Sequence, residues 1–343
     1  MVDFPSLELV DQHGRTARDL RVSLTDRCNL RCTYCMPADG LEWLPTEHSL
    51  DDAEVIRLIR LAVEHLGIRA VRFTGGEPLL RASLEHIVAA TTQMRTDQGT
   101  APRTAITTNA LGLDKRAAGL AAAGLERINI SLDSTSRTSF AALTRRDRLD
   151  DVITGIEAAI DAGLSPIKVN SVVMPGVNEE GVCDLVRFCL ERGLQLRFIE
   201  QMPLGPRGKW TREGMVTARD LLDRLEREFT LTPAAEPRGS APAALWDVTD
   251  GVHRGKVGII ASVTHPFCGA CDRTRLTTDG AVRSCLFSSA ADEVSLRDMM
   301  RAGADDAELA RAWATAMWHK KPGHGIDDTG FLQPERTMSE IGG

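Results

Sequence analysis

Three cysteines near the start of the sequence have the residue type and spacing of a metal centre. Cys28, Cys32 and Cys35 follow the pattern Cys-x3-Cys-x2-Cys on one short segment. Structural zinc normally takes four protein ligands, and no fourth Cys or His is adjacent. A cubane iron–sulfur cluster held by three cysteines instead leaves one iron open to chelate an outside molecule. The spacing therefore favours an open-site cluster. A zinc knuckle with a distant fourth ligand and a chance grouping of buried cysteines are the alternatives.

A second group of three cysteines stands near the other end of the chain: Cys268, Cys271 and Cys285. Zinc is a stronger alternative here, because Cys-x2-Cys, a remote Cys and one histidine could complete a tetrahedron. The candidate histidines are His253, His265 and His319. Two groups of three in one chain nevertheless favour two open-site clusters. Cys183 and Cys189 fall within a helical pattern and are expected to be buried packing residues.

Charge and composition narrow the class of protein. The chain has 343 residues, of which 43% are hydrophobic, and 41 basic against 48 acidic residues give a net charge of −7. That balance argues against general nucleic-acid binding, so an anionic substrate would need a local cluster of Arg or Lys. No apolar run approaches the roughly 18 residues of a membrane span, and no secretory leader is evident. We therefore expect a cytoplasmic protein with reduced thiols and no membrane partner.

The elements that must position these cysteines alternate between strands and helices. Short apolar or β-branched runs recur through residues 18–202, separated by amphipathic helical stretches such as 51–65 and 150–162. Such a repeat with right-handed crossovers forms a barrel or an open doubly wound sheet. The six expected strands span 20–24, 70–74, 104–108, 127–132, 167–174 and 194–200.

The second part of the chain reads as a smaller, cysteine-bearing extension. Residues 203–216 and 231–243 are rich in Gly, Pro, Ala or charge and are expected to be linkers or surface loops. Strand-like runs follow at 256–263, 273–277 and 281–285, and then a helix at 307–320. Residues 321–343 show no convincing periodicity.

The first cysteine motif resembles that of the radical S-adenosylmethionine superfamily. It follows the first strand and carries Tyr34 just before its last cysteine, and the second strand ends in Thr74-Gly-Gly-Glu-Pro78. In that superfamily the open iron binds the amino and carboxylate groups of S-adenosylmethionine. Reductive cleavage of the sulfonium then gives a 5′-deoxyadenosyl radical. The two glycines are expected to let the backbone approach the methionine portion closely.

The whole pattern is similar to one family within it, the GTP 3′,8-cyclases of molybdenum cofactor biosynthesis. The resemblance runs from Leu20 to Gly343. The most selective segments are FCGACDRTRLT and the terminal IGG. It implies a partial (β/α)6 TIM-like barrel at residues 1–230, and a C-terminal extension at 231–343 that closes its open side.

The resemblance also implies residue roles. The two 4Fe–4S clusters would be held by Cys28, Cys32 and Cys35 and by Cys268, Cys271 and Cys285. S-adenosylmethionine would contact Tyr34, Gly76, Ser131 and Met202. GTP would contact Arg21, Arg72, Thr107, Lys168, Arg273, Thr274 and Arg275. The implied catalytic residues are Arg21, Arg273, Arg275, Gly342 and Gly343.

Five of the implied GTP contacts are cations, which is the local cluster that an acidic protein needs for a triphosphate. Arg21, Arg72 and Lys168 lie on expected strands, where the period of two could aim them into a barrel interior. For any one of them, a surface ion pair is the ordinary alternative. The two terminal glycines offer a slender backbone that could enter a narrow barrel where a Cβ would clash.

The implied reaction removes the ribose C3′ hydrogen of GTP, and the C3′ radical attacks guanine C8. The partners open to it would be an external electron donor, a downstream cyclic pyranopterin monophosphate synthase and a second copy of the chain. One departure from the family is Ala110, where relatives have glycine; a positive φ there would be costly. The alternatives are another radical enzyme with an auxiliary cluster, such as a peptide-modifying one, and a zinc-binding interaction protein built on a barrel.

Overall fold

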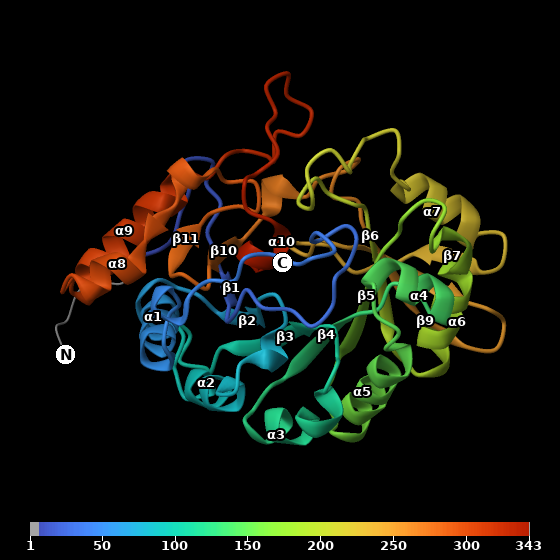
Figure 1. The fold of residues 1–343 in the computed structure, drawn as a ribbon, viewed down its shortest axis with the longest axis horizontal. Coiled ribbons are helices and arrows are strands. Elements are labelled where there is room, and N and C mark those ends of the chain that lie inside the picture. The colour runs from blue at the N-terminus through green and yellow to red at the C-terminus, as the bar shows by residue number, and fades with distance from the viewer. Residues whose placement is uncertain (1–6, 343) are drawn as a thin grey trace.

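Twelve strands form one continuous sheet in the computed structural model, which describes residues 7–342 (Figure 1). Strands β1 to β6 lie side by side in chain order and pair in parallel. They are β1 Asp19–Ser23, β2 Ala70–Thr74, β3 Arg103–Thr108, β4 Arg127–Ser131, β5 Ile167–Val172 and β6 Gln195–Ile199. These bounds match the six expected strands to within two residues, and the curved sheet confirms the expected partial barrel.

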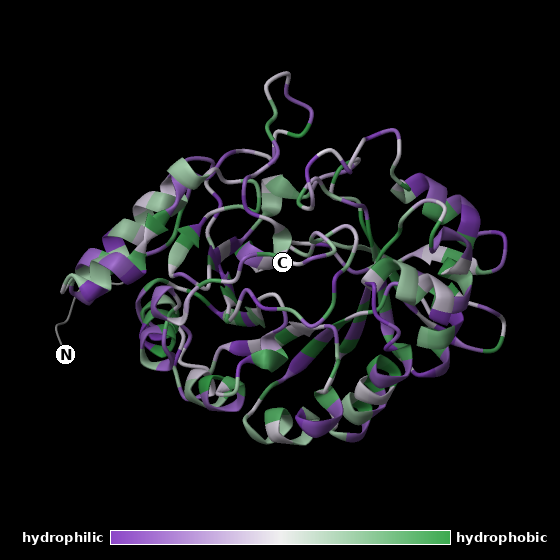
Figure 2. Ribbon diagram, in the orientation of Figure 1, coloured by the Kyte–Doolittle hydropathy of each residue, from purple (hydrophilic) through white to green (hydrophobic). Residues whose placement is uncertain are grey.

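The helices lie on the outer face of this curved sheet (Figure 1), and we call the inner side, into which alternate strand side chains point, the lumen. Helix α1 shows why they form where they do: Asp51 and Glu54 make a capping box at its start, and its apolar stripe includes Leu58 and Ile59, which are buried. Figure 2 shows green faces turned to the sheet and purple faces turned outward. The helices before the extension are α1 Asp52–His65, α2 Leu84–Thr92, α3 Ala117–Ala122, α4 Arg137–Thr144, α5 Leu149–Asp161, α6 Val182–Glu191 and α7 Ala218–Leu225.

Side chains alternate between the two faces of each barrel strand. On β1, Leu20 and Val22 are buried in the core against the helices. Asp19 and Arg21 therefore point into the lumen. Arg21 lies in register with Arg72 of β2 on one side and Arg275 on the other. The inward aim that the sequence predicts for Arg21 and Arg72 is thus present in the fold.

The C-terminal part of the chain extends both edges of the barrel sheet. Strand β10 pairs in parallel with β1, and β9 pairs in parallel with β6. The added elements are β7 Thr230–Pro233, β8 Ala244–Thr249, β9 Arg254–Ile260, β10 Arg273–Leu276, β11 Ala281–Arg283, β12 Val294–Ser295, α8 Leu296–Arg301, α9 Asp306–Trp318 and α10 Met338–Ile341. Helix α10 lies at the centre of the barrel mouth in Figure 1, in the place expected of a segment that closes the open side.

The prediction of a linker at residues 231–243 is partly wrong. The stretch 231–243 begins inside β7, which pairs antiparallel with β8, and only the remainder is a loop. Proline is tolerated at Pro233 because it ends an edge strand. No helix within residues 7–342 is long and apolar enough to cross a membrane.

Candidate active site

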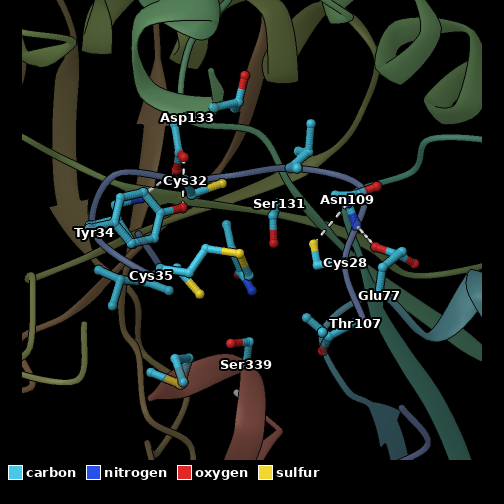
Figure 3. A pocket seen from close by; sticks show the side chains of 18 of the residues that line it. Cys28, Cys32, Tyr34, Cys35, Glu77, Thr107, Asn109, Ser131, Asp133 and Ser339 are labelled. Carbon is cyan, nitrogen blue, oxygen red and sulfur yellow. Dashed lines mark hydrogen bonds between the residues drawn. The ribbon is translucent and has the colours of Figure 1, made fainter. Parts of the chain in front are cut away.

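The first three cysteines line a cavity at the carboxyl ends of the barrel strands. The cavity has a volume of about 220 Å³, and Cys28, Cys32 and Cys35 all face it (Figure 3). It is also lined by the residues expected at S-adenosylmethionine and by one expected at GTP: Tyr34, Gly76, Ser131, Met202 and Thr107. The fold thus brings together residues that are spread over more than half of the sequence.

The two glycines after β2 allow the backbone to pack against the cysteine segment. A Cβ on Gly76 would lie 2.4 Å from the carbonyl oxygen of Arg27, and one on Gly75, whose φ is +153°, would lie 2.4 Å from that of Thr25. The Gly76 amide donates a 2.7 Å hydrogen bond to the Thr25 carbonyl. In this structure the two glycines closely approach the backbone of residues 25–27. This contact holds the segment that leads into the cysteines in place.

Glu77, directly after these glycines, organises the turn that follows β3. Its carboxylate accepts hydrogen bonds from the Thr108 hydroxyl and the Asn109 amide, both at 2.7 Å. Burial raises the pKa of Glu77 to about 7. The Asn109 side chain in turn lies 3.9 Å from the Cys28 sulfur (Figure 3). In the same turn Ala110 has a φ of +64°. The residue that stands where relatives have glycine therefore adopts the left-handed conformation, which is strained for alanine.

Tyr34 is fixed by a buried carboxylate that sequence reasoning did not single out. Its hydroxyl donates a 2.7 Å hydrogen bond to Asp133, which also accepts one of 2.8 Å from the Val172 amide (Figure 3). Burial raises the pKa of Asp133 to about 6. The ring therefore has one defined orientation at the cavity. The sequence signal available for Asp133 was its place two residues after the end of β4, close to Ser131.

The first triad has the chemistry of a cluster site. Burial raises the pKa of Cys28 to about 11 and that of Cys35 to about 12, so the metal-free thiols stay protonated at neutral pH. A metal cation is the charge that would ionise them. Within residues 7–342 no three His, Cys, Asp or Glu side chains are gathered closely enough to hold a single metal ion. Three thiols around an open cavity suit a larger group such as a 4Fe–4S cluster.

The second triad lies at the opposite end of the lumen. Cys268 and Cys271 directly precede β10, which runs parallel to β1, and Cys285 follows β11, which runs antiparallel to β10. All three are therefore at the end where β1 starts, whereas Cys28 follows the end where β1 finishes. Five residues of strand separate these ends, or about 17 Å. The two triads are therefore too far apart to share one centre.

The thiols of the second triad influence one another. Burial and the neighbouring Cys285 and Cys271 raise the pKa of Cys268. Burial alone would raise the pKa of Cys271 as well, but Lys320 and Arg273 beside it bring that pKa below its usual value. The donor set again fits a cluster with three cysteine ligands. Of the histidines considered for zinc, His253 lies in the β8–β9 turn, where its ring contacts Asp250 at 3.2 Å.

Between the two triads the lumen carries a band of buried cations. Arg21 and Arg72 share one carboxylate, Asp19, at 3.6 and 3.8 Å, which is too long for good hydrogen bonds. The Nε atoms of Arg21, Arg72 and Arg273 are buried without a hydrogen-bond partner within residues 7–342. Burial and the positive charge of Arg21 lower the pKa of Arg275. Because buried charges need partners, this band is suited to a polyanion.

Lys168 and Arg197 continue the band on β5 and β6. Burial and the neighbouring Arg197 lower the pKa of Lys168 to about 8. Arg197, which the sequence analysis missed, donates hydrogen bonds to Asn129 at 2.6 Å and Asn170 at 2.9 Å. Its position on a strand in phase with Lys168 was the available signal.

The side chain of Thr274 does not point into the lumen. It lies between Arg273 and Arg275 on β10 and therefore faces the helices, where its hydroxyl accepts a 3.0 Å hydrogen bond from the Trp313 indole. Arg273 and Arg275, one position to either side, point inward with Arg21. Only the backbone of Thr274 is placed to meet a lumen ligand.

The chain end enters the barrel. The Gly342 carbonyl accepts a 2.6 Å hydrogen bond from Arg275. Its φ is +72°, and a Cβ there would lie 2.7 Å from the Thr74 hydroxyl and 2.8 Å from Ser23 Cβ. A glycine is therefore required at this position both by conformation and by space. Gly343, the other expected tail residue, lies outside the described residues.

Comparison with known proteins agrees with this geometry. Residues 22–189 match the Radical SAM superfamily, and residues 194–326 match the family Molybdenum Cofactor Synthesis C. A GTP 3′,8-cyclase of Corynebacterium glutamicum is 66% identical over 98% of this chain and 89% of its own length. One of Mycobacterium marinum is 56% identical over 98% of this chain and 92% of its own length.

Among solved structures, Streptococcus suis SuiB bound to S-adenosylmethionine has a similar fold. The TM-score is 0.56 at 15% sequence identity, and the match covers 96% of this chain and 73% of SuiB. At this identity the similarity concerns the fold alone.

Proposed function

The chain belongs to the GTP 3′,8-cyclase family of radical S-adenosylmethionine enzymes, and from that membership we propose that it converts GTP to (8S)-3′,8-cyclo-7,8-dihydroguanosine 5′-triphosphate. This is the first step of molybdenum cofactor biosynthesis. The observation that carries the proposal is the band of buried, incompletely paired cations between two cysteine triads in one lumen.

Cys28, Cys32 and Cys35 would hold a cluster with one open iron, and the adjoining cavity would take S-adenosylmethionine. When bound, the cluster and S-adenosylmethionine supply the carbon radical that removes the ribose C3′ hydrogen. The protein's own contribution is orientation. Tyr34, held by Asp133, offers a fixed aromatic face, and Gly76, Ser131 and Met202 line the remaining wall.

The cations hold the triphosphate. Arg21, Arg72, Arg273, Arg275 and Lys168 would donate to its oxygens, with Thr107 and the Thr274 backbone beside them. Cys268, Cys271 and Cys285 would hold the other cluster, whose open iron would supply a binding position for guanine. GTP would then lie in the lumen between the two triads. The Gly342 carbonyl, which accepts a hydrogen bond from Arg275, would fix that arginine in this arrangement.

Further assignments follow from the same membership. An external electron donor reduces the first cluster, and a cyclic pyranopterin monophosphate synthase takes the product. We place the enzyme in the cytoplasm and divide it into a barrel at 1–230 and an extension at 231–343. A homodimer is the remaining prediction, which a solution mass measurement tests.

The test is anaerobic reconstitution with iron and sulfide, followed by incubation with reductant, S-adenosylmethionine and one of GTP, ATP or a peptide pool. We expect about eight irons per chain, two cubanes of four, and a cyclised product from GTP alone. Modification of peptide with no product from GTP would instead support the alternative of a peptide-modifying enzyme.

A further inference from the structure

Lys320 is a buried cation that the proposed reaction does not use. It lies two residues after the end of α9, and the residue is 2% exposed. Its ammonium donates to three acceptors: the Cys271 sulfur at 3.4 Å, the Cys271 carbonyl at 3.2 Å and the Arg273 carbonyl at 2.8 Å. An ammonium has three N–H donors, so none is left for a substrate.

The ammonium has no carboxylate to balance it. The ion pairs formed within residues 7–342 do not include Lys320, whereas the next residue, Lys321, has Asp292 at 3.9 Å. A buried charge is costly unless it is paired. Two of its three acceptors are neutral carbonyls, so the Cys271 sulfur is the one contact that can carry the balancing negative charge.

A second cation approaches the same sulfur. The Arg273 guanidinium lies 3.9 Å from it. Among the described residues, no lysine or arginine donates a hydrogen bond to the sulfur of Cys268, on the other side of the same turn. The positive charge is therefore directed at one ligand of the triad.

Arg15 holds this arrangement together from the N-terminal side. Its guanidinium donates to the carbonyls of Cys268 at 2.7 Å and Lys321 at 2.6 Å, and Asp11 anchors it at 2.5 Å. The segment that carries Lys320 is thus tied to the cysteine turn, and its ammonium has little freedom to leave the sulfur.

We propose that Lys320 is a positioning residue for the second cluster: its ammonium is the counter-cation of the Cys271 thiolate, and it retains that ligand and raises the cluster's reduction potential. The inference rests on the proposed assignment of a cluster to the second triad. Hydrogen bonds to ligand sulfurs and nearby positive charge both favour the reduced, more negative cluster. Lys320 also fixes the Arg273 carbonyl, so the same contact aligns a GTP-directed arginine with the cluster.

The test compares Lys320→Met, Lys320→Gln and Lys320→Arg with Lys321→Met as the matched control. Each loaded holoenzyme is titrated anaerobically by electron paramagnetic resonance. The second cluster is identified as the one whose signal does not respond to S-adenosylmethionine. Iron release to a chelator is followed in parallel, together with the melting temperatures of loaded and cluster-free protein.

We expect Met and Gln at 320 to make the second cluster about tenfold harder to reduce, or about 59 mV more negative for one electron. Iron from that site should be lost about ten times faster. Lys320→Arg should restore most of both properties, and Lys321→Met should match the parent. If the Met variant does not fold, the Gln variant, which keeps a hydrogen-bond donor, carries the same expectation.

An unchanged potential in the Met or Gln variant would overturn the proposal. So would equal losses of melting temperature in loaded and cluster-free protein without a shift in potential, because that result describes a role in the fold alone. A parent enzyme that holds only about four irons would overturn the assignment of the second cluster itself. That outcome is distinguishable from failure at Lys320.

Discussion

Arg21→Ala is the substitution that most cleanly separates substrate binding from folding. Arg21 lies on β1 between Arg72 and Arg275 in register, and its Nε has no hydrogen-bond partner within residues 7–342. The carboxylate beside it, that of Asp19, is 3.6 Å away. The Arg21 guanidinium therefore contributes little to the stability of the fold, whereas it could donate charged hydrogen bonds to a bound triphosphate.

The expected magnitude follows from the contacts. A hydrogen bond to a charged group is worth about 1.5 to 3 kcal/mol, and 1.4 kcal/mol is about tenfold in affinity. Arg21→Ala should weaken GTP binding by about one to two decades. Burial and repulsion within the band of cations oppose the charge on Arg275, so loss of Arg21 relieves part of that repulsion. The melting temperature should change little.

The assay is anaerobic calorimetry of loaded enzyme with GTP and, separately, with guanosine. Arg219→Ala serves as the control, because that side chain is 80% exposed and, within residues 7–342, pairs only with Asp223 of its own helix. GTP affinity should fall in Arg21→Ala and stay unchanged in the control, while guanosine binds both alike. Equal losses for GTP and guanosine would refute the assignment of Arg21 to the triphosphate.

Four further outcomes are expected. Asp19→Asn removes the carboxylate shared by two buried arginines, so the GTP-free melting temperature should fall and the stabilisation by added GTP should grow; an unchanged GTP-free value would contradict this. Tyr34→Phe should weaken S-adenosylmethionine binding by about tenfold and leave GTP affinity alone, as measured by equilibrium binding. Burial raises the pKa of Glu77 from 4.5 to about 7, so the folded protein keeps a proton that the unfolded chain releases. The contribution of Glu77 to the free energy of unfolding of cluster-free protein should therefore fall as the pH rises from 4.5 to about 7. Glu77→Gln should remove this pH dependence. Deleting Gly342 and Gly343 should abolish cyclisation but leave both clusters and S-adenosylmethionine binding, and full turnover by a C-terminally extended enzyme would show that the tail has no such role.

Local patterns were sufficient to predict the barrel strands and the inward aim of their charges. A period of two on β1 and β2 places Arg21 and Arg72 on the face opposite the core residues, and no knowledge of the rest of the fold is needed for that. The same rule predicts that Thr274 faces outward between two inward arginines. The family resemblance assigned Arg273, Thr274 and Arg275 to GTP together, so the outward direction of the Thr274 side chain was missed.

Contacts between distant segments could not be predicted in this way. Asp133 is 99 positions from the Tyr34 hydroxyl that it orients, and Lys320 is 49 positions from the Cys271 sulfur. A lone lysine after a helix has the ordinary appearance of a charge favourable to the helix end. Only the packing of α9 beside β10 turns it toward a cysteine. The edge strand β7 was missed because it has only four residues and the proline- and alanine-rich stretch that follows it gives no strand signal.

We propose that this chain removes hydrogen from the ribose C3′ of GTP in the lumen between its two triads. The most direct measurement incubates reconstituted, reduced enzyme with S-adenosylmethionine and GTP deuterated at C3′, and then examines the 5′-deoxyadenosine by mass spectrometry. We predict that one deuterium is found in 5′-deoxyadenosine and that the GTP-derived product has lost it. 5′-Deoxyadenosine without deuterium, formed while GTP is consumed, would contradict the account.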